Sequence, residues 1–256
     1  MTRLIRFRLN KQDYWGELDL DTGEAFFING SVYEKWERGN RAGNLNSLAL
    51  LPPCEPKIVA ALAYNFKDLV GKKNSYDEPL LFLKSPSTVI SGLDPIVIPR
   101  NCFMTWVEVE IAIVLKKSLF KASVEEVKDA ILGVTIANDV TTQNIANRDH
   151  HLARSKSQPT FCPVGNYLST ETDTDNLKMT TIINGVKTQD GNSRNRILND
   201  YESLSLVSQS LQLFPGDLIL TGTPAGAMSS LIKPGDSAIL SIEKLGTLSN
   251  SIAEEK

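Results

Sequence analysis

The stretch TWVEVEIAIVL (residues 105–115) is the most informative part of the sequence. Its regular alternation predicts a β-strand with Val107, Val109 and Ile111 on one face. Glu108 and Glu110 would then share the other face, roughly 7 Å apart, so that both carboxylates can reach one cation. Two like charges side by side are otherwise unfavourable. An edge strand with a solvated acidic face is the alternative, and spacing alone leaves both interpretations open.

A third carboxylate supports the cation site. The segment Ile136-Ala-Asn-Asp-Val140 predicts an apolar strand that ends at Asp139. Three carboxylates without histidine or cysteine favour a hard ion such as Mg²⁺, with Mn²⁺ as the alternative. The two histidines of the chain, His150 and His151, are adjacent, so one chain cannot supply a three-histidine site.

Further short strands are predicted on both sides of this segment, and Asn184-Gly185 predicts a two-residue hairpin turn. These strands are expected at residues 4–9, 14–18, 25–28, 57–62, 80–83, 96–98, 179–183, 186–188, 218–221 and 238–243. Helices are predicted near 32–38, from the capping box at Ser123 to Gly133, and from a cap at Asp200. Most strands lack the helices that parallel crossovers need, so we expect a mostly β (α+β) fold, a mixed roll or sandwich with peripheral helices.

The proline-rich segment 51–56 suggests a boundary. We therefore expect a small β-rich N-terminal unit at 1–55 and a catalytic domain at 56–256.

Composition excludes several classes of function. A net charge of −3 offers no basic footprint for nucleic acid or for a membrane surface. We find no apolar run long enough to cross a bilayer and no signal-peptide core at the N-terminus. Three scattered cysteines indicate neither a disulfide framework nor a zinc knot, and a cytoplasmic location fits best.

Seven segments, taken together, resemble the fumarylacetoacetate hydrolase family in order and spacing. They are KIVAALAYN (57–65), EPLLFLK (78–84), EVE (108–110), ANDV (137–140), RSKS (154–157), FCP (161–163) and LTGTPAG (220–226). The resemblance implies the β-roll of this family, a homodimer, and 2-oxo acid substrates with a second carbonyl or an enol. It also implies Mg²⁺ or Mn²⁺ bound by Glu108, Glu110 and Asp139.

The same resemblance assigns further roles. Lys156 would reach the substrate and take part in catalysis, and Gly222 and Thr223 belong to a loop that grips a carboxylate. Tyr64 and Lys84 are candidate substrate contacts, although Tyr64 can equally be a core residue and Lys84 can order the site. Where relatives often read Ala-Arg-Asp-x-Gln, this chain reads TQNIA (142–146), which leaves Gln143 as a candidate contact with altered specificity.

One departure from the family concerns the proton-transfer group. Hydrolytic members carry a histidine and a glutamate that activate water, and here the same positions are Lys67 and Val70. Lysine is normally protonated at neutral pH and is a poor base for water. Lys67, delivered by a lid over residues 71–75, is the first candidate for proton transfer. His150 and His151 are the others.

Three functions follow from these residues. The first is a metal-dependent isomerase, tautomerase or decarboxylase that acts through an enolate on a 2-oxo or 2-hydroxy-dienoic dicarboxylic acid. The second is a hydrolase of an acylpyruvate-like C–C bond, which additionally needs activated water. The third is a catalytically silent binding protein on the same fold, against which the intact set of carboxylates argues.

Overall fold

The computed structural model describes residues 2–70, 78–102, 104–143 and 149–255. The predicted lid, 71–75, lies outside these ranges. The described chain is built from short strands with four short α-helices. The helices are α1 (Lys67–Val70), α2 (Val124–Val127), α3 (Ala153–Lys156) and α4 (Asp200–Ser210). Within the described residues, no helix combines the length and the apolar character that a bilayer crossing requires.

Three sheets make up the β structure of the described chain. The strands of the N-terminal unit are β1 (Arg3–Leu9), β2 (Gln12–Asp19), β3 (Glu24–Gly30), β4 (Trp36–Asn44) and β5 (Ala49–Leu51). The remaining strands are β6 (Val59–Ala63), β7 (Leu80–Lys84), β8 (Val89–Ser91), β9 (Ile96–Ile98), β10 (Thr105–Trp106), β11 (Val109–Leu115), β12 (Ile131–Asn138), β13 (Thr141–Thr142), β14 (Cys162–Val164), β15 (Leu168–Ser169), β16 (Lys178–Ile183), β17 (Val186–Asn192), β18 (Leu218–Leu220), β19 (Leu231–Ile232), β20 (Ser237–Ile242) and β21 (Gly246–Glu254).

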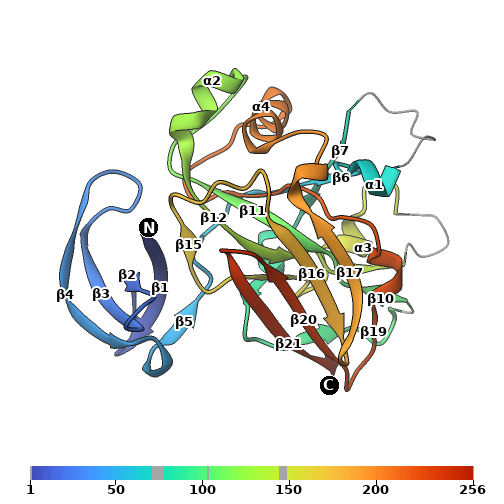
Figure 1. Ribbon diagram of the computed structural model, residues 1–256, viewed down its shortest axis with the longest axis horizontal. Coiled ribbons are helices and arrows are strands. Elements are labelled where there is room, and N and C mark those ends of the chain that lie inside the picture. The colour runs from blue at the N-terminus through green and yellow to red at the C-terminus, as the bar shows by residue number, and fades with distance from the viewer. Residues whose placement is uncertain (1, 71–77, 103, 144–148, 256) are drawn as a thin grey trace.

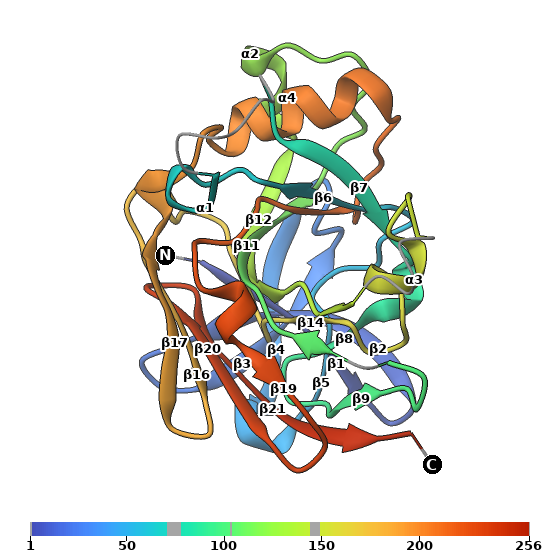
Figure 2. The same ribbon diagram turned by 90° about the vertical axis from the view of Figure 1, so that its right-hand side faces the viewer.

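The largest sheet runs in the order β4-β3-β2-β1-β15-β12-β11-β18-β6-β7, so the N-terminal strands continue the sheet that carries the acidic residues. A second sheet has the order β17-β16-β20-β21-β9, and a small third sheet has the order β13-β10-β19. Figure 1 shows the N-terminal strands on one flank, the second sheet in front of β11 and β12, and α2 and α4 at one end. Figure 2 shows α3 beside β7.

Strand β11 is buried on both faces because it lies at the centre of these layers. Ile111 and Ile113 pack into the core between the two large sheets, whereas Ala112 and Val114 pack into a second apolar cluster on the opposite face. The alternation predicted from the sequence is therefore present, but neither face of β11 meets solvent. The fold is mostly β with peripheral helices, as predicted.

Three predicted elements differ in the structure because long-range pairing overrides local preference. The helix predicted at 32–38 is wrong: the chain turns after Gly30 and forms β4, which pairs with β3. The helix predicted to reach Gly133 ends earlier, since Ile131 pairs with Leu115 and begins β12. The single strand predicted at 105–115 is divided between β10 and β11, which belong to different sheets.

The hairpin prediction and the helix caps follow local rules. Asn184 and Gly185 both have positive φ angles and connect β16 to β17. The capping box at Ser123 is present. Helix α4 is capped by Asn199, one residue before the predicted Asp200.

Candidate functional site

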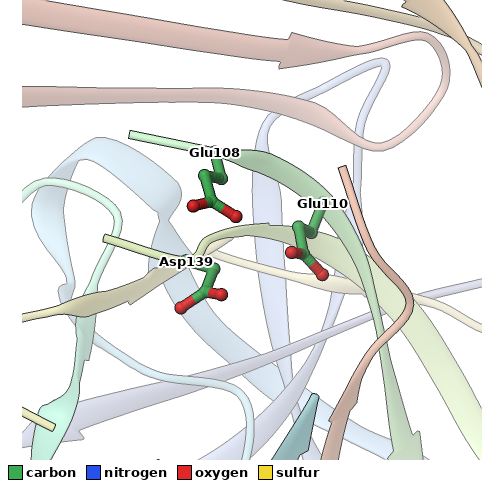
Figure 3. A group of neighbouring side chains, drawn as sticks. All are labelled: Glu108, Glu110 and Asp139. Atoms are coloured by element: carbon green, nitrogen blue, oxygen red, sulfur yellow. The ribbon is translucent and has the colours of Figure 1, made fainter. Parts of the chain in front are cut away.

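Three carboxylates meet where β10, β11 and β12 come together. Glu108 lies at the break between β10 and β11, Glu110 lies on β11, and Asp139 directly follows β12. The backbone N–H of Asp139 donates to the carbonyl of Glu108 at 3.0 Å, which draws the ends of the two strands together. One oxygen of each carboxylate lies within 4.8 Å of the others. Figure 3 shows the three carboxyl groups turned toward a common space.

Two lysines partly neutralise the negative charge of this cluster. Lys84 lies under Asp139 with its side chain fully buried, and its ammonium donates to Asp139 Oδ1 at 2.6 Å and to the carbonyls of Val140 and Lys156. Lys156 on α3 donates to Asp139 Oδ2 and, at 3.3 Å, to Glu108 Oε1. Each lysine thus holds a different oxygen of Asp139.

The carboxylates differ in their electrostatic surroundings. Burial, together with the charges of Asp139 and Glu108, raises the pKa of Glu110 well above its ordinary value. Burial alone would raise the pKa of Asp139 as well, but the ammonium groups of Lys156 and Lys84 hold that pKa below its ordinary value. The carboxylates of Asp139 and Glu108 outweigh burial at Lys156 and raise the pKa of its ammonium.

The donor set fits a divalent cation. Glu110 is 2 % exposed and Asp139 is fully buried, and three carboxyl groups face two ammonium groups, so ionisation of all three leaves one negative charge uncompensated. Buried charge of this kind is costly unless it is paired or bound to a metal. Carboxylate oxygens are the ligands of Mg²⁺ and Mn²⁺. Glu108, Glu110 and Asp139 would therefore hold such an ion.

A cavity of about 430 Å³ opens above the carboxylates. Lys156, Thr223 and Tyr64 lie in its wall together with His150. The rest of the wall is mainly apolar or hydroxylated and consists of Leu62, Ala63, Leu69, Leu80, Phe82, Trp106, Thr141, Thr142, Leu152, Ser155, Ala227 and Met228. This arrangement of acidic floor, one lysine and an apolar rim can bind a small anion beside a cation.

Several predicted site residues lie outside the cavity wall. Lys67 is exposed on α1, although Leu69 of the same helix reaches the wall. Gln143 is exposed, and its backbone N–H donates to Met104. Lys84 is not in the wall either, and its ammonium holds Asp139 and the Lys156 carbonyl of α3 in place. Gly222 contacts a candidate metal ligand instead, because its backbone N–H donates to Glu110 Oε2 at 2.6 Å. His151 is likewise absent from the wall.

Sequence reasoning missed the residues that fix Glu108 and Thr223. Trp106 Nε1 and the Thr141 hydroxyl both donate to Glu108 Oε1, at 2.7 and 2.8 Å. The amide of Gln189 donates to the Thr223 hydroxyl oxygen at 2.9 Å. Trp106 shares the strand face of Glu108 in the sequence pattern, which is a usable signal. Gln189 gives none, since β17 lies far along the chain in another sheet.

Comparison with known proteins identifies the family. Residues 58–253 match the family model described as fumarylacetoacetate (FAA) hydrolase, C-terminal. The chain belongs to the fumarylacetoacetate hydrolase family. Members of this family generally bind a divalent metal, and the fold is the mostly β architecture that the motifs implied.

The similar proteins include both isomerases and hydrolases. A 2,4-didehydro-3-deoxy-L-rhamnonate hydrolase of a Sphingomonas species is 30% identical over 98% of this chain and 96% of its own length. The 2-hydroxyhepta-2,4-diene-1,7-dioate isomerase of Mycobacterium marinum is 29% identical with a TM-score of 0.89 over 100% of this chain and 99% of its own. A 5-carboxymethyl-2-hydroxymuconate delta-isomerase of Mycobacterium smegmatis is 27% identical with a TM-score of 0.89, over 99% and 100%.

Proposed function

We propose that the protein is a Mg²⁺- or Mn²⁺-dependent enzyme that isomerises, tautomerises or decarboxylates a 2-oxo or 2-hydroxy-dienoic dicarboxylic acid through an enolate. The observation that carries the proposal is the convergence of Glu108, Glu110 and Asp139 at the floor of a cavity whose wall contains Lys156 and Thr223. The isomerase names of two structural relatives support this reaction class.

The chain's own residues supply binding and orientation. A bound divalent cation supplies Lewis-acid stabilisation of an enolate oxygen. Lys156 places an ammonium beside the cation site, where it can pair with the substrate carboxylate or with the developing enolate. Thr223 offers a hydroxyl from the opposite loop. The apolar rim of Leu69, Leu80 and Met228 excludes water from the reacting carbons.

Lys67 and His150 are the two candidates for the group that transfers the proton. Lys67 occupies the position of the family histidine, but its side chain is exposed and lies outside the described cavity wall. His150 lies in that wall, and an imidazole can both accept and donate a proton near neutral pH. Comparison of His150→Gln with Lys67→Met decides between them: the variant of the proton shuttle should lose about a hundredfold or more in kcat, with Mg²⁺ affinity retained.

Hydrolysis of a C–C bond is the second candidate. The rhamnonate hydrolase relative, 30% identical over nearly the whole chain, favours it. Hydrolysis needs a base that activates water, and Lys67 and Val70 stand where hydrolytic family members carry histidine and glutamate. His150 would have to fill this role.

The deciding experiment is product analysis by NMR with added Mg²⁺. Oxaloacetate, acetylpyruvate and a 2-hydroxy-dienoic diacid are compared, each with a chelator control. We expect isomerisation or decarboxylation to exceed acetate release from acetylpyruvate. Rapid acetate release would establish the hydrolase instead. Mg²⁺ binding without turnover of any of these acids would support the non-catalytic binding protein.

We also propose that the protein is a homodimer, as the family resemblance implies. Strand β7 ends the largest sheet, and Leu83 on it is 47% exposed. An exposed apolar edge strand is a common site of association. Sedimentation equilibrium should give twice the mass of the chain, and a monomer at micromolar concentration would contradict this.

A further inference from the structure

Gln189 is a buried amide in a strand whose neighbouring residues are largely accessible. It lies on β17, is 1% exposed, and is flanked by Thr188 and by Asp190, which is exposed. Its side chain leaves the second sheet and reaches both the acidic strand β11 and the loop that carries Thr223. Gln189 thus connects two parts of the candidate site, and the proposed function gives it no role.

The orientation of this amide is fixed by two backbone groups, one of which can only donate a hydrogen bond and the other only accept one. The backbone N–H of Val109 can only donate, and it donates to Gln189 Oε1 at 3.2 Å. The carbonyl of Pro224 can only accept, and it accepts from Gln189 Nε2 at 3.0 Å. The Thr181 hydroxyl also donates to Oε1, at 2.7 Å. The amide nitrogen must therefore face Thr223.

This orientation determines what Thr223 can do. Because Nε2 donates to the Thr223 oxygen, that oxygen is an acceptor within the protein and its own hydrogen remains to be donated. Among the described residues, this hydroxyl donates to no acceptor, and Thr223 lines the cavity. The hydroxyl is thus directed to act as a donor toward a bound acceptor such as a carboxylate or enolate oxygen.

The backbone around the amide is packed tightly enough to hold this arrangement. A side chain at Gly191 would collide with Pro224, and one at Gly226 would collide with the carbonyl of Thr188. Gly226 also has a φ of 103°, which other residues rarely adopt. The loop therefore lies against β17 with little freedom.

We infer that Gln189 is a positioning residue that sets Thr223 as a hydrogen-bond donor and thereby makes the site selective for an anionic oxygen beside the cation. The inference rests on the proposed function, since it concerns the anion end of the same cavity. Gln189 acts through Thr223 and touches no reacting atom itself.

The test measures binding of a defined probe without turnover. Oxalate carries adjacent oxygens like those of a 2-oxo acid enolate, and its affinity is measured by calorimetry on Mg²⁺-loaded protein. The variants are Gln189→Met, Thr223→Val, their double mutant, and Thr223→Ser. Gln209→Met is the matched control, because Gln209 also donates two hydrogen bonds but lies exposed on α4.

We expect Gln189→Met to weaken oxalate binding about tenfold, as loss of one oriented hydrogen bond to a charged group would, with Mg²⁺ affinity unchanged. The double mutant should bind oxalate no more weakly than Thr223→Val alone. Thr223→Ser should retain oxalate binding, because serine keeps the hydroxyl that Gln189 orients. Gln209→Met should bind as the wild type does.

Two results overturn the inference. Wild-type oxalate affinity in Gln189→Met, or fully additive losses in the double mutant, would show that Gln189 does not act through Thr223. If Gln189→Met does not fold, Gln189→Glu replaces it, because the carboxylate keeps acceptors for Val109 and Thr181 but lacks the donor. A wild-type protein that binds neither Mg²⁺ nor oxalate would overturn the proposed function together with the inference.

Discussion

Glu110 and Asp139 lie in one cluster, yet their surroundings predict opposite effects on stability. Glu110 is buried among like charges, so Glu110→Gln removes repulsion and should leave the melting temperature of the metal-free protein unchanged or higher. Asp139→Asn leaves Lys84 and Lys156 poorly compensated and should cost about 3–5 kcal/mol. Thermal unfolding in chelator measures both.

Both substitutions should also reduce the stabilisation that Mg²⁺ confers on the folded state. The exposed Glu125→Gln on α2 serves as the control for loss of one carboxylate. An undiminished rise of the melting temperature with Mg²⁺ in Glu110→Gln would contradict the assignment of Glu110 as a ligand.

Lys156 competes with a cation for the oxygens of Asp139 and Glu108. Lys156→Met should therefore raise Mg²⁺ affinity or leave it unchanged. It should also lower turnover by about a hundredfold or more, because a charge-assisted contact to the transition state is lost. Calorimetry and steady-state kinetics on one preparation separate the two effects. A variant with weakened Mg²⁺ binding and normal turnover would require new roles for Lys156.

At the scale of elements, the tripeptide Pro-Gly-Asp occurs in two turns with different burial. Asp217 is fully buried, and its carboxylate accepts from the backbone N–H groups of Lys57, Ile58 and Phe214 at 2.7–2.8 Å. It thereby ties the start of β6 to β18, beside the acidic strand β11. Asp236 is only half-buried, and its carboxylate accepts from the backbone N–H of Lys233 and from the Asn184 amide.

These turns provide a matched pair of substitutions. Asp217→Ala should destabilise the protein by about 3 kcal/mol or more, because three buried donors lose a charged acceptor. Asp236→Ala should cost only about 1 kcal/mol, since water replaces the lost acceptor. Urea unfolding at equilibrium gives both values. Equal losses would mean that the turn motif matters and its burial does not.

At the scale of the whole molecule, the N-terminal strands are built into the largest sheet. β1 pairs with β15 through Leu4 and Leu168, and both side chains are fully buried in one cluster. Arg3 is also buried, and it bonds to the Ser169 hydroxyl and, at 3.0 Å, to the carbonyl of Lys244.

Removal of residues 1–55 should therefore expose an apolar strand edge on the rest of the chain. We expect the fragment 56–256 to melt at a lower temperature than the full chain and to aggregate. Light scattering during a thermal scan measures this. A monodisperse fragment with the melting temperature of the full chain would show that the two parts are energetically independent.

The sequence by itself determined the features that depend on short stretches of chain. The alternation around Glu110, the Asn184-Gly185 hairpin and the Ser123 capping box follow from steric and hydrogen-bonding rules that act within a few residues. The three carboxylates were identified as a group because their residue types, the strand pattern and the order of the family motifs all pointed to one site.

Only the tertiary structure decided the features that depend on which distant segments pair. Residues 36–44 form a strand because β3 offers a partner, although the sequence predicts a short helix over 32–38. His150 reached the cavity wall and Lys67 did not, and Gln189 met Thr223 from another sheet. Such contacts follow from burial and from long-range hydrogen bonds, and no local pattern in the sequence encodes either one.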